Sequence, residues 1–151
     1  MEWMLMPLRK YAQFSGRARR KEFWMFALLN VIVYAVILGL MFLTSGTSNF
    51  VVVDSADVFA VYSAMFSGVG WLLAVWGAAV FIPSLAVTVR RLHDRDMSGW
   101  WYLGFLVVSL IPFIGFIASI ALLVLLVLPG TPGPNRFGPD PKDPSSADVF
   151  S

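Results

Sequence analysis

Residues 23–43 read FWMFALLNVIVYAVILGLMFL, an apolar run without a single charged side chain. A helix of about 20 such residues, rising 1.5 Å per residue, spans the ~30 Å hydrocarbon core of a bilayer. Two longer charge-free stretches follow, from Val58 to Val89 and from Ser98 to Asn135. None of the three leaves the polar face that a helix in water requires. The chain is therefore predicted to be an all-α, integral membrane helical bundle.

The composition excludes several other classes of protein. Hydrophobic residues make up 58% of the chain and charged residues 13%, against about 45–50% and about 25% in soluble domains. Cysteine is absent, which excludes disulfides, thiolate metal sites and cysteine nucleophiles. The formal net charge of +2 is too small to suggest a nucleic-acid partner.

Three parts are expected along the chain. Residues 1–22 form a basic N-terminal segment that suits a short amphipathic helix at the membrane surface, ended by Ser15-Gly16; a disordered leader is the alternative. Residues 23–128 form the transmembrane domain. Residues 129–151 form a tail so rich in proline and glycine that regular helix or strand is excluded, and its last ten residues are expected to be disordered.

About three transmembrane helices are predicted. The first runs from Phe23 to Leu43 and is too long for the apolar region of a secretory signal peptide. Residues 44–57 form a polar loop, and residues 58–67 an interfacial approach. The second helix lies near Gly68 to Val89, and a second polar loop covers Arg90 to Gly99.

The third apolar stretch, Trp100 to Leu128, carries Pro112 and Gly115 near its middle. Proline removes a backbone donor and bends a helix. A single transmembrane helix kinked at Pro112 is favoured, because a hairpin would put irregular backbone at membrane depth without much protein to cover it. The alternative is a helical hairpin turning at residues 112–115, which would give four helices.

Positive charge predicts the orientation. Cytoplasmic loops carry an excess of Lys and Arg. The leader holds six such residues, the first loop none, and the second loop Arg90, Arg91 and Arg95. The N-terminus and the second loop are thus predicted to be cytoplasmic, and three crossings would leave the tail outside.

Three polar clusters, taken in order, resemble a known family. They are Gly16-Arg17-Ala18-Arg19-Arg20-Lys21-Glu22-Phe23-Trp24, then Arg90-Arg91-Leu92-His93-Asp94 with Ser98-Gly99-Trp100-Trp101, then Asn135-Arg136-Phe137-Gly138-Pro139-Asp140-Pro141. With the apolar stretches between them, they resemble the bacterial inner-membrane family catalogued as domain of unknown function 805. The resemblance covers nearly the whole chain, from Trp3 to about Lys142. It implies a multi-pass protein of the bacterial inner membrane and brings no established activity, ligand or catalytic residue.

The pair His93-Asp94 invites an acid–base interpretation, because a carboxylate can orient an imidazole. Adjacent residues seldom face each other, and no second histidine exists. Local pairing is favoured instead, of Arg90 or Arg91 with Asp94 and of Arg95 with Asp96 or Glu22. Nearby arginines would also repel a divalent cation, so no metal, cofactor or catalytic residue is assigned.

The basic clusters suit lipid headgroups, because cations beside a transmembrane helix attract anionic leaflets. Glu22 is expected to reach Arg90 or Arg91, at the ends of two helices on one side. Residues of the three clusters are the candidate binding positions for a headgroup or partner: Arg17, Arg19, Arg20, Glu22, Arg90, Arg91, His93, Asp94, Trp100, Trp101, Asn135, Arg136 and Asp140.

The function favoured by these patterns is a non-enzymatic membrane scaffold or accessory subunit whose partners are anionic lipids, copies of itself or a larger membrane complex. A subunit of an oligomeric transporter or pore is the alternative. No ionisable residue lies deep in an apolar stretch, which argues against ion-coupled transport. An enzyme acting on lipids through His93 and Asp94 is the third hypothesis.

Overall fold

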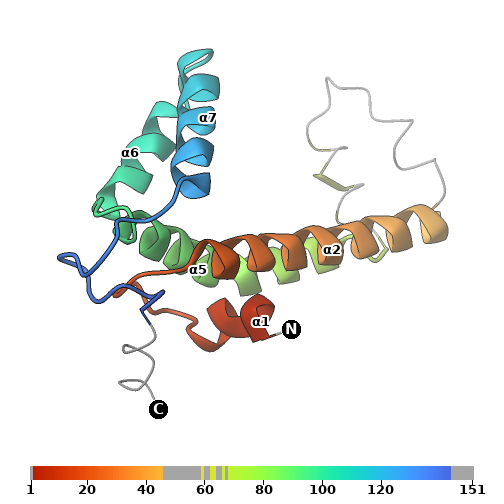
Figure 1. Cartoon of the computed structure of the whole chain (residues 1–151). Coiled ribbons are helices and arrows are strands. Elements are labelled where there is room, and N and C mark those ends of the chain that lie inside the picture. Colours follow the sequence, from red (N-terminus) through yellow and green to blue (C-terminus); the bar gives the residue numbers. More distant parts are fainter. Residues whose placement is uncertain (1, 46–58, 60–61, 64–65, 67, 144–151) are drawn as a thin grey trace. The chain divides into compact units, whose positions relative to one another are not determined.

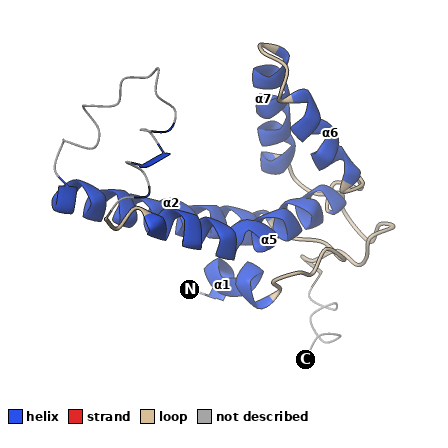
Figure 2. Ribbon diagram, turned by 180° about the vertical axis from the view of Figure 1, so that it is seen from behind, coloured by secondary structure: helices blue, strands red, loops and turns tan. Residues whose placement is uncertain are grey.

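The computed structural model describes residues 2–45, 59, 62–63, 66 and 68–143. Its helices are α1 (Glu2–Arg9), α2 (Arg20–Ser45), α5 (Trp71–His93), α6 (Trp100–Val108) and α7 (Ile114–Val127) (Figure 1). The described residues contain no strand (Figure 2) and only one isolated bridge, between Asn135 and Gly138. The all-α prediction is confirmed, whereas most of the polar loop at 44–57, of the interfacial approach at 58–67 and of the last ten residues lies outside the described residues.

Two helices are long and apolar enough to cross a membrane, α2 and α5. Their large apolar side chains are widely exposed, as at Val31, Val36 and Val75, with 64%, 56% and 54% of their surface free. The core helix of a soluble protein would bury such residues, so this continuous apolar surface is typical of contact with lipid. The predicted limits of the first helix are confirmed to within three residues at each end.

The described chain divides into two compact units. Residues 27–81 form one of them, in which part of α2 packs against the first half of α5. There Trp76 Nε1 donates a hydrogen bond of 3.1 Å to Asn30 Oδ1, and Gly77 lets the Tyr34 hydroxyl approach to 3.7 Å of where a Cβ would lie. One partly buried polar pair and one close approach thus join the two helices.

The other unit comprises residues 1–26 and 82–151 and holds all three polar clusters. The leader forms a helix, α1, as predicted, and the chain then turns at Gly16, whose φ of +84° favours glycine. The second helix differs from expectation, because α5 continues through Arg90, Arg91 and His93 instead of ending at Val89. No helix-breaking residue interrupts these positions, and basic side chains in a last turn complement the helix dipole.

The third apolar stretch is a helical hairpin. Helices flank Pro112 as expected, but α6 ends at Val108 and α7 begins at Ile114, and the two lie side by side (Figures 1 and 2). Phe113 adopts a left-handed φ of 64°, and the Ile114 N–H donates to the Pro112 carbonyl at 2.8 Å. The structure therefore has two helices where the favoured prediction has one kinked helix, as in the hairpin alternative. The helix α7 has 14 residues, or about 21 Å, which is shorter than a bilayer core.

The hairpin returns the tail to the second loop. Thr131 N–H donates to the Asp94 carbonyl at 2.8 Å, and Asn135 Nδ2 donates to the His93 carbonyl at 2.9 Å. The tail had been expected on the opposite side from this loop, as three crossings would require. It contacts this loop instead, because the third stretch turns back on itself.

The turn of the hairpin depends on Gly115. A Cβ there would lie 2.8 Å from the carbonyl carbon and 2.9 Å from Cα of Ser109. We expect Gly115→Ala to destabilise the hairpin by about 1–3 kcal/mol, as overpacking does elsewhere, and to speed hydrogen exchange over residues 100–127. Gly104→Ala, in open space on α6, is the control and should be neutral or slightly stabilising. Equal exchange in the two variants would contradict the tight turn.

Candidate functional site: a buried cluster of charges

Five ionisable side chains are withdrawn from solvent where the three polar clusters meet. Arg17, Glu22, Arg90, Arg91 and Asp94 expose 9%, 3%, 1%, 0% and 3% of their surface. The first follows the turn at Gly16, the second lies in the first turn of α2, and the others end α5 or follow it directly. Charges buried to this extent must be paired and hydrogen-bonded.

Asp94 is the centre of the cluster. Its Oδ1 accepts a hydrogen bond of 2.9 Å from Arg17 Nε, and its Oδ2 accepts one from Arg91 Nη1. The remaining Arg17 nitrogens donate to the carbonyls of Gly133 and Thr131, each at 2.6 Å. One carboxylate thus joins the leader to α5, and Arg17 joins both to the tail.

Arg91 ties the end of the hairpin to the same point. Its Nε donates to the Leu126 carbonyl at 3.1 Å, and its Nη2 donates to the Leu128 carbonyl. The last carbonyls of any helix lack intrahelical partners, and a cation there is further favoured by the helix dipole. The planar guanidinium serves Asp94 and both carbonyls at once, which a lysine ammonium could not do in the same geometry.

The predicted pair between Glu22 and α5 is present. Arg90 Nη1 donates to Glu22 Oε1 at 2.7 Å, and the Arg90 carbonyl accepts from the Ala18 N–H at 3.1 Å. Both partners are almost fully buried. Breaking such a pair leaves an uncompensated charge in a poorly solvated place, which is far more costly than losing a surface ion pair.

The tail closes over the cluster with contacts of its own. The His93 ring stacks on Phe137, with centroids 3.9 Å apart and 3° between the planes, and His93 Nδ1 lies 3.2 Å from the Gly16 carbonyl. Asp140 accepts hydrogen bonds from the backbone of Lys142 at 2.9 Å and Gly133 at 3.1 Å. These donors, Lys142 first, hold the pKa of the Asp140 carboxyl below its ordinary value.

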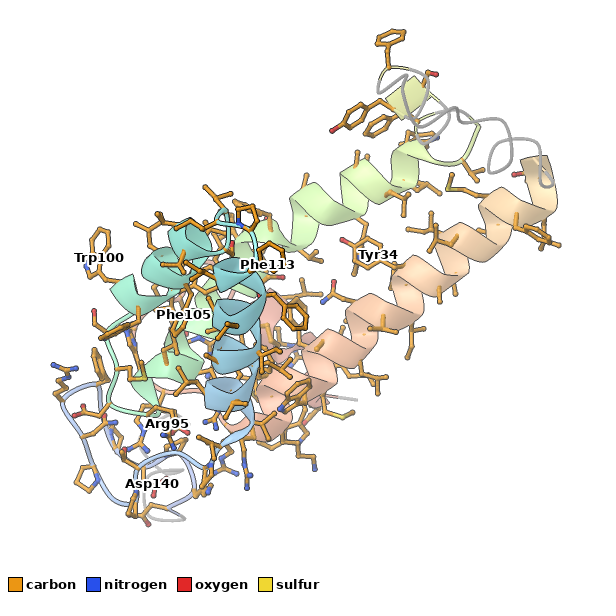
Figure 3. All side chains as sticks on the ribbon, turned by 90° about the horizontal axis from the view of Figure 1, so that it is seen from above. Tyr34, Arg95, Trp100, Phe105, Phe113 and Asp140 are labelled. Carbon is orange, nitrogen blue, oxygen red and sulfur yellow. The ribbon has the colours of Figure 1, made fainter. Side chains whose placement is uncertain are left out.

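Other predicted positions lie at the periphery. Trp100 and Trp101 are 77% and 56% exposed, and Trp100 projects from the start of α6 (Figure 3). Arg19 lies over the Trp3 ring at 5.5 Å, and the exposed Arg20 makes a long 3.4 Å contact to the Val127 carbonyl. Two exposed side chains, Arg136 and Asp96, pair at 3.1 Å.

Arg95 has a partner that the sequence did not predict. Its Nη1 donates to the Pro129 carbonyl at 2.7 Å, whereas Asp96 and Glu22, its expected partners, are taken by Arg136 and Arg90. The sequence does not predict the hydrogen bonds to the carbonyl groups of the tail. Every residue carries a carbonyl group, and a sequence does not show which of them accept a hydrogen bond from an arginine. The glycine content of the tail is the one sequence feature that indicates its close contact with the second loop, since a Cβ on Gly130 would collide with Asp94.

The arrangement offers little for catalysis. Asp94 is engaged by two arginines and His93 by Gly16 and Phe137, so they do not form the oriented base that their adjacency suggested. Over the described ranges, no three His, Asp or Glu side chains are grouped as a metal site would need. The buried cluster joins the leader, the end of α5 and the tail through ion pairs and hydrogen bonds, and basic side chains surround it.

Comparison with known proteins identifies the family. The family model described as "Protein of unknown function (DUF805)" matches residues 11–139. The chain is 44% identical to the inner membrane protein YhaH of Escherichia coli K12 over 142 residues, covering 94% of this chain and 98% of YhaH. It is 42% identical to the inner membrane protein YhaI of the same organism, covering 94% of this chain and 97% of YhaI. No solved structure matches it. With its apolar helices and these relatives, the chain belongs to the DUF805 family of inner-membrane proteins.

Proposed function

We propose that this chain is a non-enzymatic membrane scaffold, or an accessory subunit of a membrane complex, with a basic cytoplasmic face that engages anionic lipid headgroups. The observation that carries the proposal is that the charged residues of the polar motifs bind one another and the backbone. Arg17, Arg91 and Asp94, which would have to be free for chemistry, are consumed in holding leader, helices and tail together. A device that fixes helix ends to one another suits a protein whose role is to present a surface.

The basic surface around the cluster supports the lipid half of the proposal. Arg9, Lys10, Arg20 and Lys21 are exposed, close in sequence to exposed Tyr11, Phe14 and Trp24. Aromatic rings beside cations are typical of the interface between bilayer and water. Each such cation adds about 1 kcal/mol of attraction to an anionic leaflet. In the tail, Arg136 and Lys142 are offset by acidic neighbours at Asp96, Asp140 and Asp143.

A matched pair of variants tests the lipid half. Arg9→Gln with Lys21→Gln removes one Arg and one Lys from the leader and α2, and Arg136→Gln with Lys142→Gln removes the same charges from the tail. We expect phosphatidylglycerol, added to detergent micelles, to raise the Tm of the natural chain more than phosphatidylcholine does. The leader variant should lose most of this difference and the tail variant little, because about 1 kcal/mol per cation is roughly a fivefold change in binding constant. Equal behaviour of both variants would contradict a headgroup-binding face.

Orientation has its own test, because the chain has no cysteine. We propose that the leader, the second loop and the tail are all cytoplasmic. Cysteines placed one at a time at Met97 and Lys142 should resist an impermeant maleimide in intact cells and react after permeabilisation. A cysteine at Ser48, between α2 and α5, should react at once. Labelling at Lys142 without labelling at Met97 would separate the tail from the second loop and contradict the hairpin.

A further inference from the structure

A cavity of about 440 Å³ opens beside the buried cluster, within the unit formed by residues 1–26 and 82–151. Its wall comes from α1, the start of α2, the end of α5 and the tail. This volume falls within the range of small-molecule sites, about 300–1,000 Å³. The cavity is thus large enough for a headgroup-sized ligand.

Arg90 lies in the wall of the cavity with two of its three guanidinium nitrogens unused. Its Nη1 binds Glu22, but Nε and Nη2 have no hydrogen-bond partner among the described residues, although the side chain is only 1% exposed. Buried donors of a charged group are normally satisfied. The Nε–H and one Nη2–H share an edge of the planar guanidinium, and that edge holds two oxygens of a phosphate or carboxylate side by side.

The charge of the wall also favours an anion. Four cations line the cavity, Lys10, Arg17, Arg19 and Arg90, against one carboxylate, Glu22. Glu22 is taken by Arg90, and Arg17 is neutralised by Asp94. Lys10 and Arg19 therefore leave the wall positive. Asp140 lies in sequence between the lining residues Pro139 and Pro141. Its carboxylate accepts hydrogen bonds from the backbone N–H groups of Gly133 and Lys142.

Apart from the polar Gln13 and Ser15 and two glycines, the rest of the lining is apolar or aromatic. It consists of Trp3 and Met6 from α1, and Phe137, Pro139 and Pro141 from the tail. A bare inorganic anion would gain nothing from such a wall. A phosphate joined to a hydrocarbon chain would bind more tightly, because its charge pairs with the cations of the wall while its apolar surface is removed from water against the apolar residues. The chemistry points to an anionic amphiphile.

We propose that this cavity is a binding site for the phosphate of an anionic amphiphile, with the free edge of Arg90 gripping two phosphate oxygens and with Lys10 and Arg19 completing the charge. The proposal deepens the headgroup-binding function and rests on it. It replaces a diffuse attraction to the leaflet by one defined site. The leader and the tail, which supply most of the wall, would be held together by the ligand.

The test uses the full chain in a neutral detergent, with dihexanoyl phosphatidylglycerol and inorganic phosphate as probes in titration calorimetry. Lys10→Gln with Arg19→Gln is the cavity variant. Its control is the tail variant Arg136→Gln with Lys142→Gln, which also removes one Lys and one Arg but lies outside the lining. We expect one saturable site for the short-chain lipid, at least about tenfold weaker in the cavity variant and within about twofold of the natural chain in the control. Arg90→Lys should keep the charge but lose the fork, and should weaken binding similarly.

The arms distinguish the possible results. Tighter binding of the lipid than of inorganic phosphate identifies an amphiphile, whereas equal binding identifies the phosphate alone and overturns the apolar half of the proposal. If the cavity variant binds like the natural chain while the leader variant, Arg9→Gln with Lys21→Gln, is weakened, the cavity proposal fails and the headgroup-binding face stands. If no variant differs and no saturable site appears, both fail. Lys10 and Arg19 make no buried ion pair, so the outcome does not depend on whether Arg90→Lys folds.

Discussion

Replacing Asp94 by asparagine should lower the free energy of unfolding by about 3–5 kcal/mol, as removing one partner from a buried ion pair does in other proteins. Asparagine keeps the size of the side chain but removes the charge that compensates both Arg17 and Arg91. Its amide group also puts a donor against one of two arginines that can only donate. The Tm of the purified chain in detergent is the measurement.

Asp96→Asn is the matched control, because Asp96 is two residues away, 47% exposed and paired only at the surface with Arg136. A surface ion pair contributes about 0–1 kcal/mol, so this variant should melt close to the natural chain. A double variant of Arg17→Gln with Asp94→Asn should be less destabilised than the sum of the two single changes, because the partners share one interaction. Strict additivity, or equal melting of the two aspartate variants, would show that the buried cluster does not hold the fold together.

The second large effect is expected at Gly130. A Cβ there would lie 2.5 Å from Cγ and 2.8 Å from the carbonyl oxygen of Asp94, and closer still to Oδ2. Asp94 cannot move away, because Arg17 and Arg91 hold its two oxygens. We expect Gly130→Ala to cost about 2–3 kcal/mol, at the upper end of overpacking effects, as the tail is forced off the second loop.

Limited proteolysis gives a direct view of this change. The tail of the Gly130→Ala variant should be cleaved near residues 131–143 faster than that of the natural chain, in addition to the fall in Tm. Gly39→Ala is the control, since a Cβ at Gly39 meets nothing within 4 Å. A tail equally resistant in both variants would show that the contact between Gly130 and Asp94 is not required to seat it.

The sequence predicted those parts of the fold that depend on composition over many residues. The helix α2 appears almost as expected, because charge-free apolar residues have few alternatives in a membrane. The sequence predicts a contact of Glu22 with Arg90 or Arg91, because these residues lie at the ends of neighbouring helices, and the structure gives Arg90 as the partner. The candidate binding roles of these positions stay predictions.

What the sequence could not predict depends on long-range geometry. The pairing of Arg17 with Asp94 joins residues 77 positions apart, and no local pattern marks it. The sequence disfavours the hairpin for lack of protein to cover its turn, and the turn is indeed open, with Leu110 and Phe113 79% and 89% exposed. Its backbone is satisfied from within instead, as where the Gly115 N–H donates to the Ile111 carbonyl at 2.7 Å. Arg91 binds the carbonyls of Leu126 and Leu128 at the end of α7. It therefore has a structural role in addition to its predicted effect on orientation.

The connection between Arg17 and the tail has a consequence for the order in which the chain is made. Arg17 emerges early from the ribosome, but its partner carbonyl at Gly133 lies 116 residues later. At about 5–20 residues per second, the leader waits roughly 6–23 s before that partner exists. During this interval Asp94 and Arg91 can pair within their own turn, but Arg17 has no tail to bind. The leader, which is synthesised before the helices that follow it, is therefore among the last segments to reach its final contacts, and it stays open to proteases and to insertion partners until Gly133 has been made.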